Sequence, residues 1–214
     1  MGSQLAAHKT PCTAQQLVDA LVALWPSELG GSPSLETVCV LASQWALETG
    51  NGSSMVCFNI GNEKCPNPAA FDYCYFTTWE DGIPAARARA MVAADSRCTA
   101  KGTWPATDAP GSVLSVSFHP DHPACRFRAF GSLKEGAQVY LRGMWSHWTA
   151  AWPFACKGDP EGFAAGLRQQ GYYTAPVATY AADMRHYFDI FMKSVALPSV
   201  DPLADTTPPG GSTA

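Results

Sequence analysis

The stretch QWALETGNGSSMVCFNIGNEK, residues 44–64, carries a carboxylate, Glu48, at the end of a predicted apolar helix. We expect this helix to begin after Ser34, whose side chain can cap the first turn. We expect it to end at Gly50, because glycine readily adopts the left-handed backbone that follows many helices. The sequence therefore places a single ionisable side chain at the C-terminal end of a helix that is otherwise apolar in this turn.

The position of Glu48 bears on its chemistry. It follows Trp45 by three residues and Leu41 by seven, so it shares their apolar face. Burial disfavours the carboxylate form, and the negative end of the helix dipole also opposes ionisation, so both effects raise the pKa. A carboxyl group that is protonated near neutral pH suits a general acid for glycosidic cleavage. The alternative is a surface glutamate in a last helical turn.

Composition and charge exclude several classes of protein. The chain has 214 residues, of which 15% are charged, and its net charge is -4. Without a run of Lys or Arg, this balance argues against a nucleic-acid partner. No apolar run approaches the roughly 20 residues of a membrane-spanning helix. In HPDH, His119, Asp121 and His122 lack an evident further ligand, so we expect neither a metal nor another cofactor.

The cysteines suggest an oxidising compartment. Their even number and the lack of a CxxC pair predict disulfides rather than a zinc site, with buried free thiols as the alternative. The first residues lack the apolar core of a signal peptide. We therefore expect a protein of the periplasm or the extracellular cell wall that is delivered without a classical leader, or whose leader is missing from this sequence. The eight cysteines are Cys12, Cys39, Cys57, Cys65, Cys74, Cys98, Cys125 and Cys156.

The remaining patterns predict a mainly helical α+β protein. Capping boxes at Thr13, Thr77 (with Glu80) and Ser132, and an Asp159–Pro160 start, mark further helices. Alternation over 113–130 predicts a β-hairpin that turns at Pro120–Asp121. We expect an N-terminal extension over 1–12, one domain over 13–197 and a disordered tail over 198–214. The expected helices span residues 13–25, 34–49, 77–95, 132–148, 159–170 and 177–195.

Three motifs resemble one family. ALETGNGSS followed by FNIGN is similar to the signature of lysozyme-like peptidoglycan hydrolases, especially glycoside hydrolase family 73, the endo-β-N-acetylglucosaminidases. The match puts Glu48 on the catalytic glutamate, Ser54 on the last serine of the motif and Asn59 on the asparagine of the following turn. CRFRAFGSLKEGAQVYL (125–141) and GYYTAPVATYAADMRHYF (171–188) are similar to two further blocks, and the second puts Tyr172 and Tyr180 on the family's tyrosines.

The resemblance implies a lysozyme-like fold with a small β-hairpin lobe, and the peptidoglycan glycan strand as substrate. Asn59, Ser54, Tyr172 and Tyr180 would then contact the substrate. For Asn59 the alternative is a residue that ties the loop backbone, and for Tyr172 it is packing under the last helix. Aromatic faces suit pyranose rings, so four tryptophans are candidate stacking platforms, although core packing explains each: Trp104, Trp145, Trp148 and Trp152.

The chain departs from the family where a second acid is expected. The hairpin glutamate before the FRAF block is absent, and an insertion of about 64–112 is unusually long. Glu63 and Glu80 are the candidates for a second carboxylate, and Asp72 and Asp121 are weaker ones. Without a second acid, the acetamido group of the substrate could assist, or the protein could act as a lytic transglycosylase.

Other functions remain open at this point. A muramidase would cleave the other bond of the same strand, and a non-catalytic wall-binding module would keep the fold without the reaction. Disulfides without a leader would suit an antibacterial, bacteriolytic toxin or a phage-type lysin. An immunity or inhibitor protein that closes the cleft would be a second partner of such a toxin.

Overall fold

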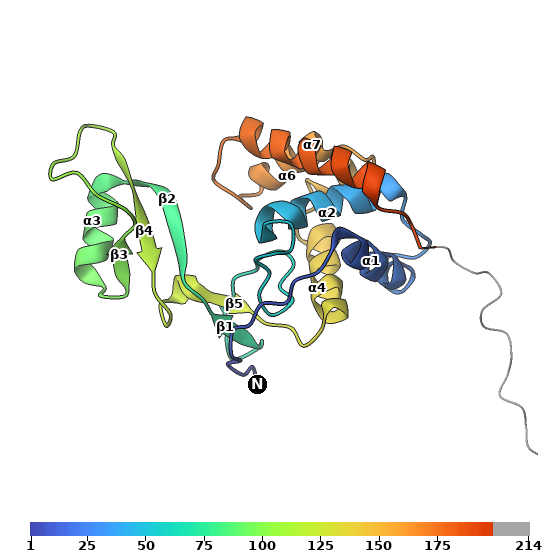
Figure 1. Ribbon diagram of the computed structural model, residues 1–214, viewed down its shortest axis with the longest axis horizontal. Helices are drawn as coiled ribbons and strands as arrows, with labels where there is room; N and C mark the ends of the chain where they lie inside the picture. The colour runs from blue at the N-terminus through green and yellow to red at the C-terminus, as the bar shows by residue number, and fades with distance from the viewer. Residues whose placement is uncertain (199–214) are drawn as a thin grey trace, which may run out of the picture.

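The computed structural model describes residues 1–198, and helix α2 (Leu35–Thr49) runs through the middle of their helical part (Figure 1). The Ser34 hydroxyl accepts a hydrogen bond from the Thr37 N–H, and Gly50 ends the helix with a φ of 57°. Every residue from Thr37 to Ala46 is buried. The predicted start and end of this helix are therefore confirmed, and burial extends around the helix instead of following one face.

Five further helices surround α2: α1 (Ala14–Glu28), α4 (Leu133–Ser146), α5 (Trp152–Ala155), α6 (Pro160–Gln169) and α7 (Val177–Ser194). Helix α7 packs against α2 and α6, and α1 packs against α4 and α2. The predicted caps at Thr13, Ser132 and Asp159 all accept backbone hydrogen bonds. One boundary differs, because Pro26 lies inside the last turn of α1. The backbone bond from Leu29 N–H to the Trp25 carbonyl (2.9 Å) keeps that turn closed.

A β-rich lobe stands beside the helical body (Figure 1). Strand β1 (Tyr73–Tyr75) pairs with β5 (Arg126–Arg128), and both lie between the body and the rest of the lobe. In the second sheet, β4 (Val113–Phe118) lies between β2 (Thr78–Pro84) and β3 (Cys98–Ala100), and all pairs are antiparallel. Helix α3 (Ala85–Ala94) covers this sheet, and the short 3-10 helix η1 (Pro123–Cys125) leads into β5. The α+β class, mainly helical with a small β lobe, is confirmed.

Two predictions for the lobe were wrong. Residues 78–84 form β2 instead of the first turns of a helix, so the capping box of Thr77 and Glu80 does not exist and α3 begins after Pro84. The cause is tertiary, since β4 offers a partner strand to a segment with Thr, Trp and Ile. The predicted hairpin over 113–130 is also absent. Its two halves belong to different sheets, because the chain turns at Asp121 (φ 77°) and passes through η1 before β5.

The N-terminal segment is built into the molecule. The Leu5 N–H donates to the Tyr73 carbonyl (2.8 Å), and the Thr10 N–H donates to the Met55 carbonyl (3.0 Å). Residues 1–12 therefore follow β1 and the loop after α2 instead of standing apart as an extension. The tail predicted for 198–214 lies, apart from residue 198, outside the described residues. Across residues 1–198, none of the helices has the length and apolar character that a membrane span requires.

The predicted disulfide framework is not present in the structure. All eight cysteines are free thiols, and six of them are buried. Burial raises the pKa of the Cys39 thiol to about 12 and that of Cys12 to about 11. Cys57 and Cys74 share a small core beside β1, and Sγ of Cys57 also lies 3.7 Å from the Ala6 carbonyl oxygen and 3.5 Å from Nδ1 of His8. The alternative of buried free thiols describes the structure, and the cysteines give no support for an oxidising compartment.

Candidate active site

Glu48 lies on the wall of an open cleft of about 680 Å³. The cleft lies between the end of α2, the loop Gly61–Lys64, one face of α4 and the segment Tyr172–Tyr173. Its position follows from the fold, because Tyr140 on α4 and Tyr172 before α7 both bond to Gln44 in α2. The predicted acid therefore borders a space that an extended ligand can enter.

The surroundings of Glu48 change its proton affinity. Burial raises the pKa of the Glu48 carboxyl from 4.5 to about 7, while hydrogen bonds from Tyr180 and Gln44 act in the opposite direction. The Tyr180 hydroxyl donates to Oε1 of Glu48 at 3.2 Å. Its ring stacks on Tyr173 with a centroid distance of 3.9 Å. Glu48 is thus half protonated near neutral pH, as its place on the helix predicts.

Tyr172, in the segment before α7, bonds to the helix that carries Glu48. Its hydroxyl oxygen accepts from Nε2 of Gln44 (2.7 Å), and its proton goes to the Gly61 carbonyl (2.9 Å). Burial raises the pKa of Tyr172 well above its ordinary value, so it stays neutral. Tyr172 therefore joins α2 to the loop across the cleft, while its ring lines the cleft wall.

Two residues of this network were missed in the sequence. Gln44 is fully buried one helical turn before Glu48, and Tyr140 on α4 donates to Oε1 of Gln44 at 2.8 Å. A polar residue in an apolar helix, four positions before the candidate acid, was the signal that could have identified Gln44. Tyr140 gives no local signal, since its partner is 96 positions away.

Glu63 also lines the cleft, as predicted for this loop. Its Oε2 lies 3.1 Å from Nη1 of Arg128 on β5, which forms an ion pair with both side chains partly exposed. Asn59 holds the loop in place. It is 3% exposed, and its amide bonds to the backbone N–H and carbonyl of Glu63 and to the Arg128 carbonyl. These bonds match the loop-tying alternative for Asn59, which does not line the cleft.

The structure does not bring the other predicted residues to the centre of the cleft. Ser54 is exposed in the turn after α2. Glu80 is exposed on β2 in the lobe, and its charge acts on Lys64 at the cleft edge. Desolvation lowers the pKa of Lys64, and the charges of Cys125 and Glu80 oppose that shift. Glu80 thus lies near one end of the cleft and not beside Glu48.

Of the four candidate tryptophans, Trp148 lines the cleft, and its ring packs edge-on against Tyr172 at 4.8 Å. Trp152 stacks on Trp25 in the body, and Trp104 donates to the Ser115 carbonyl in the lobe. Trp145 is 38% exposed on α4. Trp148 and Tyr172 therefore supply an aromatic wall close to Glu48.

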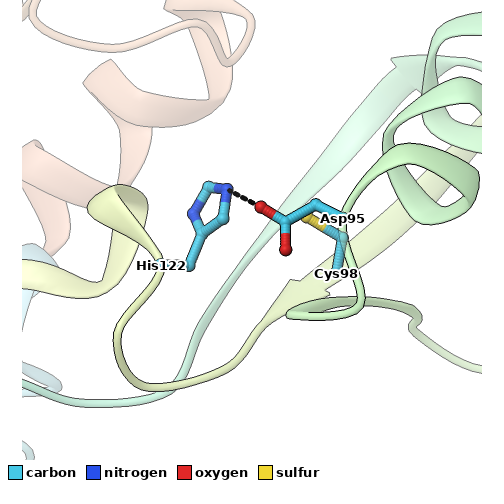
Figure 2. Close-up of side chains that lie close together, drawn as sticks. All are labelled: Asp95, Cys98 and His122. Atoms are coloured by element: carbon cyan, nitrogen blue, oxygen red, sulfur yellow. Dashed lines mark ion pairs between the residues drawn. The ribbon is translucent and has the colours of Figure 1, made fainter.

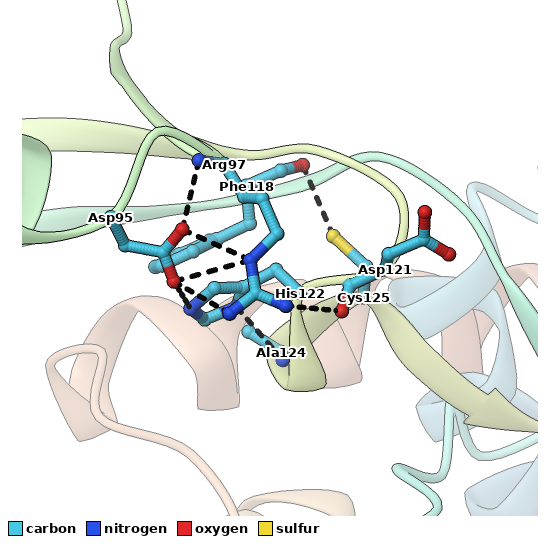
Figure 3. A network of polar contacts seen from close by, with 7 residues as sticks. All are labelled: Asp95, Arg97, Phe118, Asp121, His122, Ala124 and Cys125. Carbon is cyan, nitrogen blue, oxygen red and sulfur yellow. Dashed lines mark hydrogen bonds and ion pairs between the residues drawn. The ribbon is translucent and has the colours of Figure 1, made fainter.

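The lobe holds a second cluster of reactive side chains, Asp95, Cys98 and His122 (Figure 2). One candidate ligand atom from each lies within 4.8 Å of the others. Figure 3 shows that Asp95 and His122 already have partners. Arg97 holds the Asp95 carboxylate at 2.7 Å, and Nδ1 of His122 accepts the Ala124 N–H at 3.0 Å. In the neutral ring the proton must then sit on Nε2, which faces Asp95 at 3.8 Å.

This arrangement makes the cluster an ion-pair network. A metal would need the Nε2 lone pair, and the Arg97 guanidinium would repel a cation at Asp95. His119, which the sequence grouped with His122, pairs with the Thr99 hydroxyl at 3.0 Å. The Asp121 carbonyl accepts from Nη1 of Arg97 at 2.8 Å. The network therefore fixes the turn between β4 and η1.

Comparisons with known proteins give structural matches alone, since no protein-family model and no curated protein matches the chain. The chain is similar to a peptidoglycan hydrolase from Sphingomonas sp. A1, with 21% identity over 84% of this chain and 91% of that chain and a TM-score of 0.48. It is also similar to a glycoside hydrolase domain of Salmonella typhimurium FlgJ (16% identity, 84% and 98% covered, TM-score 0.46). A third match is the catalytic domain of the autolysin Auto from Listeria monocytogenes (17%, 86% and 88%, TM-score 0.41).

Proposed function

We propose that the protein is a lysozyme-like peptidoglycan hydrolase that cleaves a β-1,4 glycosidic bond of the glycan strand, with Glu48 as general acid. The observation that carries this proposal is the Glu48 carboxyl group, which burial brings to a pKa of about 7 on the wall of an open cleft. A general acid works best when its pKa is near the working pH. The sequence motifs add the N-acetylglucosaminidase type of bond.

The proposed reaction begins with protonated Glu48. It donates its proton to the glycosidic oxygen as the bond from that oxygen to C1 breaks, and the sugar ring gains positive charge. The Tyr180 hydroxyl, 3.2 Å from Oε1, then stabilises the carboxylate that is left. Trp148 and Tyr172 offer an aromatic wall on which a sugar ring can pack.

Hydrolysis also needs a group that activates water or stabilises C1. Glu63 is the carboxylate that shares the cleft with Glu48, and Glu80 lies nearer its edge. We assign this role to Glu63 first, with Glu80 as the alternative. Lytic transglycosylation is a second candidate, favoured by the ion pair of Glu63 with Arg128. That pair leaves Glu48 as the carboxylate without a cation partner among the described residues that line the cleft.

The proposed substrate sets the place of action and the partners. Peptidoglycan lies outside the cytoplasmic membrane, so the protein would act in the periplasm or on the cell wall. The open cleft offers an inhibitor or immunity protein a place to block the substrate. A toxin or lysin would have such a partner. Binding of the partner would compete with binding of cell-wall fragments.

The test is a digest of purified peptidoglycan by wild type, Glu48→Gln and Glu36→Gln, followed by borohydride reduction and mass spectrometry. Glu36 lies in the first turn of the same helix, so it is a matched control. We expect Glu48→Gln to lose at least about 100-fold in rate, the usual contribution of a general acid, and Glu36→Gln to stay active. Equal release by wild type and Glu48→Gln would refute the role of Glu48.

The ends of the fragments separate the alternatives. Reducible ends mean hydrolysis, and glucosaminitol or muramitol then names the cleaved bond. Anhydro ends mean transglycosylation. Loss of activity in Glu63→Gln or in Glu80→Gln identifies the second carboxylate. Binding to cell walls without any release by folded wild type would show a wall-binding module instead of an enzyme.

A further inference from the structure

Gln44 is a polar side chain in the interior of the molecule. It lies in the middle of α2 with 0% exposure, one helical turn before Glu48. A buried carboxamide is costly unless its oxygen and its N–H groups have partners. Its partners therefore show what the side chain does.

The partners of Gln44 determine which of its groups is the donor and which is the acceptor. The Gly61 carbonyl accepts from Tyr172 (2.9 Å), so the Tyr172 oxygen must itself accept, and the Gln44 NH₂ group must face it (2.7 Å). The Gln44 oxygen then faces Tyr140, whose single hydroxyl proton is shared between that oxygen (2.8 Å) and the Leu41 carbonyl (2.9 Å). The Tyr172 proton thus points to the Gly61 carbonyl, and the Tyr140 proton points to acceptors on α2.

One N–H of Gln44 remains after the other has bonded to Tyr172, since a carboxamide carries two N–H groups. Glu48 lies four residues further on the same helix, which places both side chains on one face. Gln44 also lowers the pKa of the Glu48 carboxyl, which is the direction that favours the carboxylate form. Tyr180 on α7 donates a separate hydrogen bond to the Glu48 carboxyl group.

We propose that Gln44 is a positioning residue of this site: its carboxamide holds Tyr140 and Tyr172 in place and presents its second N–H to the Glu48 carboxylate left after proton transfer. This inference rests on the proposed function for its catalytic meaning, and on the geometry alone for its effect on Glu48. The tyrosines that face Glu48 stay neutral, because burial raises the pKa of each one. The other charged or titratable groups that line the cleft are Glu63, Lys64, Arg128, Arg142, His147 and Tyr173.

The test measures the proton affinity of Glu48 directly. Glutamate carboxyl carbons are labelled with ¹³C, the Glu48 signal is assigned by its loss in Glu48→Gln, and its pKa is read from an NMR titration. We expect Gln44→Met to raise that pKa by about one unit, the worth of one hydrogen bond to a charged group. Ser43→Ala is the matched control, because Ser43 is equally buried on α2 but donates to the Cys39 carbonyl. An unchanged pKa in folded Gln44→Met overturns the proposal.

A second measurement uses the wild-type protein, in case Gln44→Met does not fold. The side-chain NH₂ signals of Gln44 are expected to titrate with the pKa of Glu48 and to stop titrating in Glu48→Gln. NH₂ signals of Gln44 whose chemical shifts do not change as Glu48 titrates would overturn the proposal. Activity is read separately: the alkaline limb of peptidoglycan cleavage should move upward in Gln44→Met. Wild type without cleavage would refute the proposed function, while the NMR shift would still decide the role of Gln44.

Discussion

Glu48 illustrates how the surroundings of one side chain set its chemistry. The same burial that raises its pKa to about 7 makes its charged form unfavourable in the folded state. Tyr180 and Gln44 offset part of this effect with hydrogen bonds, so the carboxyl group exchanges its proton near neutrality instead of keeping it. A residue held in this balance can give up a proton and take it back, which is what repeated turnover requires.

The shifted pKa predicts how stability depends on pH. Between the ordinary value of 4.5 and about 7, folded Glu48 keeps a proton that the unfolded chain has lost. The unfolded state then binds fewer protons, so the contribution of Glu48 to the free energy of unfolding falls as pH rises through this range. The full effect is on the order of 3 kcal/mol, at 1.36 kcal/mol per pKa unit.

Urea denaturation at several pH values between about 5 and 8 measures this effect. We expect the stability of wild type to fall relative to that of Glu48→Gln, which has no carboxyl group at this position. Parallel profiles for the two proteins would mean that the pKa of Glu48 is not raised in the folded state.

At the scale of elements, helix α4 connects the cleft to the core. Its Tyr140 bonds to α2, and its first turns press against the loop after α2 at Gly136. A Cβ at Gly136 would lie 2.0 Å from the Phe58 carbonyl oxygen, which is closer than atoms can approach. The close approach of α4 to this loop therefore requires a residue without a side chain.

Two glycines of α4 should respond in opposite ways to alanine. Gly136→Ala is expected to destabilise the fold by about 1–3 kcal/mol or more, because backbone must move. At Gly143 the nearest atom to a Cβ is Oε1 of Glu63 at 3.8 Å, an ordinary contact. Gly143→Ala should therefore stabilise the helix by up to about 1 kcal/mol. Thermal unfolding of both variants decides the matter, and a shift in the same direction would contradict this packing.

At the scale of the whole molecule, the lobe and the body have separate cores. Ile83, Val116 and Phe118 belong to the lobe core, whereas α2 organises the body. The connection runs through β1, β5 and the N-terminal segment, and the cleft reaches it at Lys64 and Arg128. The cleft thus borders both parts of the molecule.

Thiol accessibility tests whether the cysteines are free and which of them are buried. A short pulse of iodoacetamide on the native, reduced protein should label Cys156, which is exposed, and more slowly Cys12, which is half buried. The six buried cysteines should react when the protein unfolds, since alkylation needs an accessible thiolate. Mass spectrometry of peptides reads the sites. If protein purified without reductant shows no free thiols after denaturation, the disulfide framework expected from the sequence is present instead.

Local sequence determined where α1, α2, α4 and α6 begin and where the acid lies. Ser34, Gly50 and the spacing of Leu41, Trp45 and Glu48 are interactions within one or two helical turns, so α2 and its terminal carboxylate could be predicted. The same holds for the caps of α1, α4 and α6, where each signal lies within four residues of its partner.

Tertiary structure decided the strand at 78–84, the two separate sheets and the polar network of the cleft. Residues 78–84 form a strand because β4 lies beside them, and the paired residues, from Pro84–Val113 to Thr78–Phe118, are 29 to 40 positions apart. Gln44 meets Tyr140 and Tyr172 across 96 and 128 positions, and Glu63 meets Arg128 across 65. No local pattern encodes such contacts, because they form only when distant segments of the chain pack around α2. The sequence by itself thus determined which acid stands at the end of the helix, and packing decided what surrounds it.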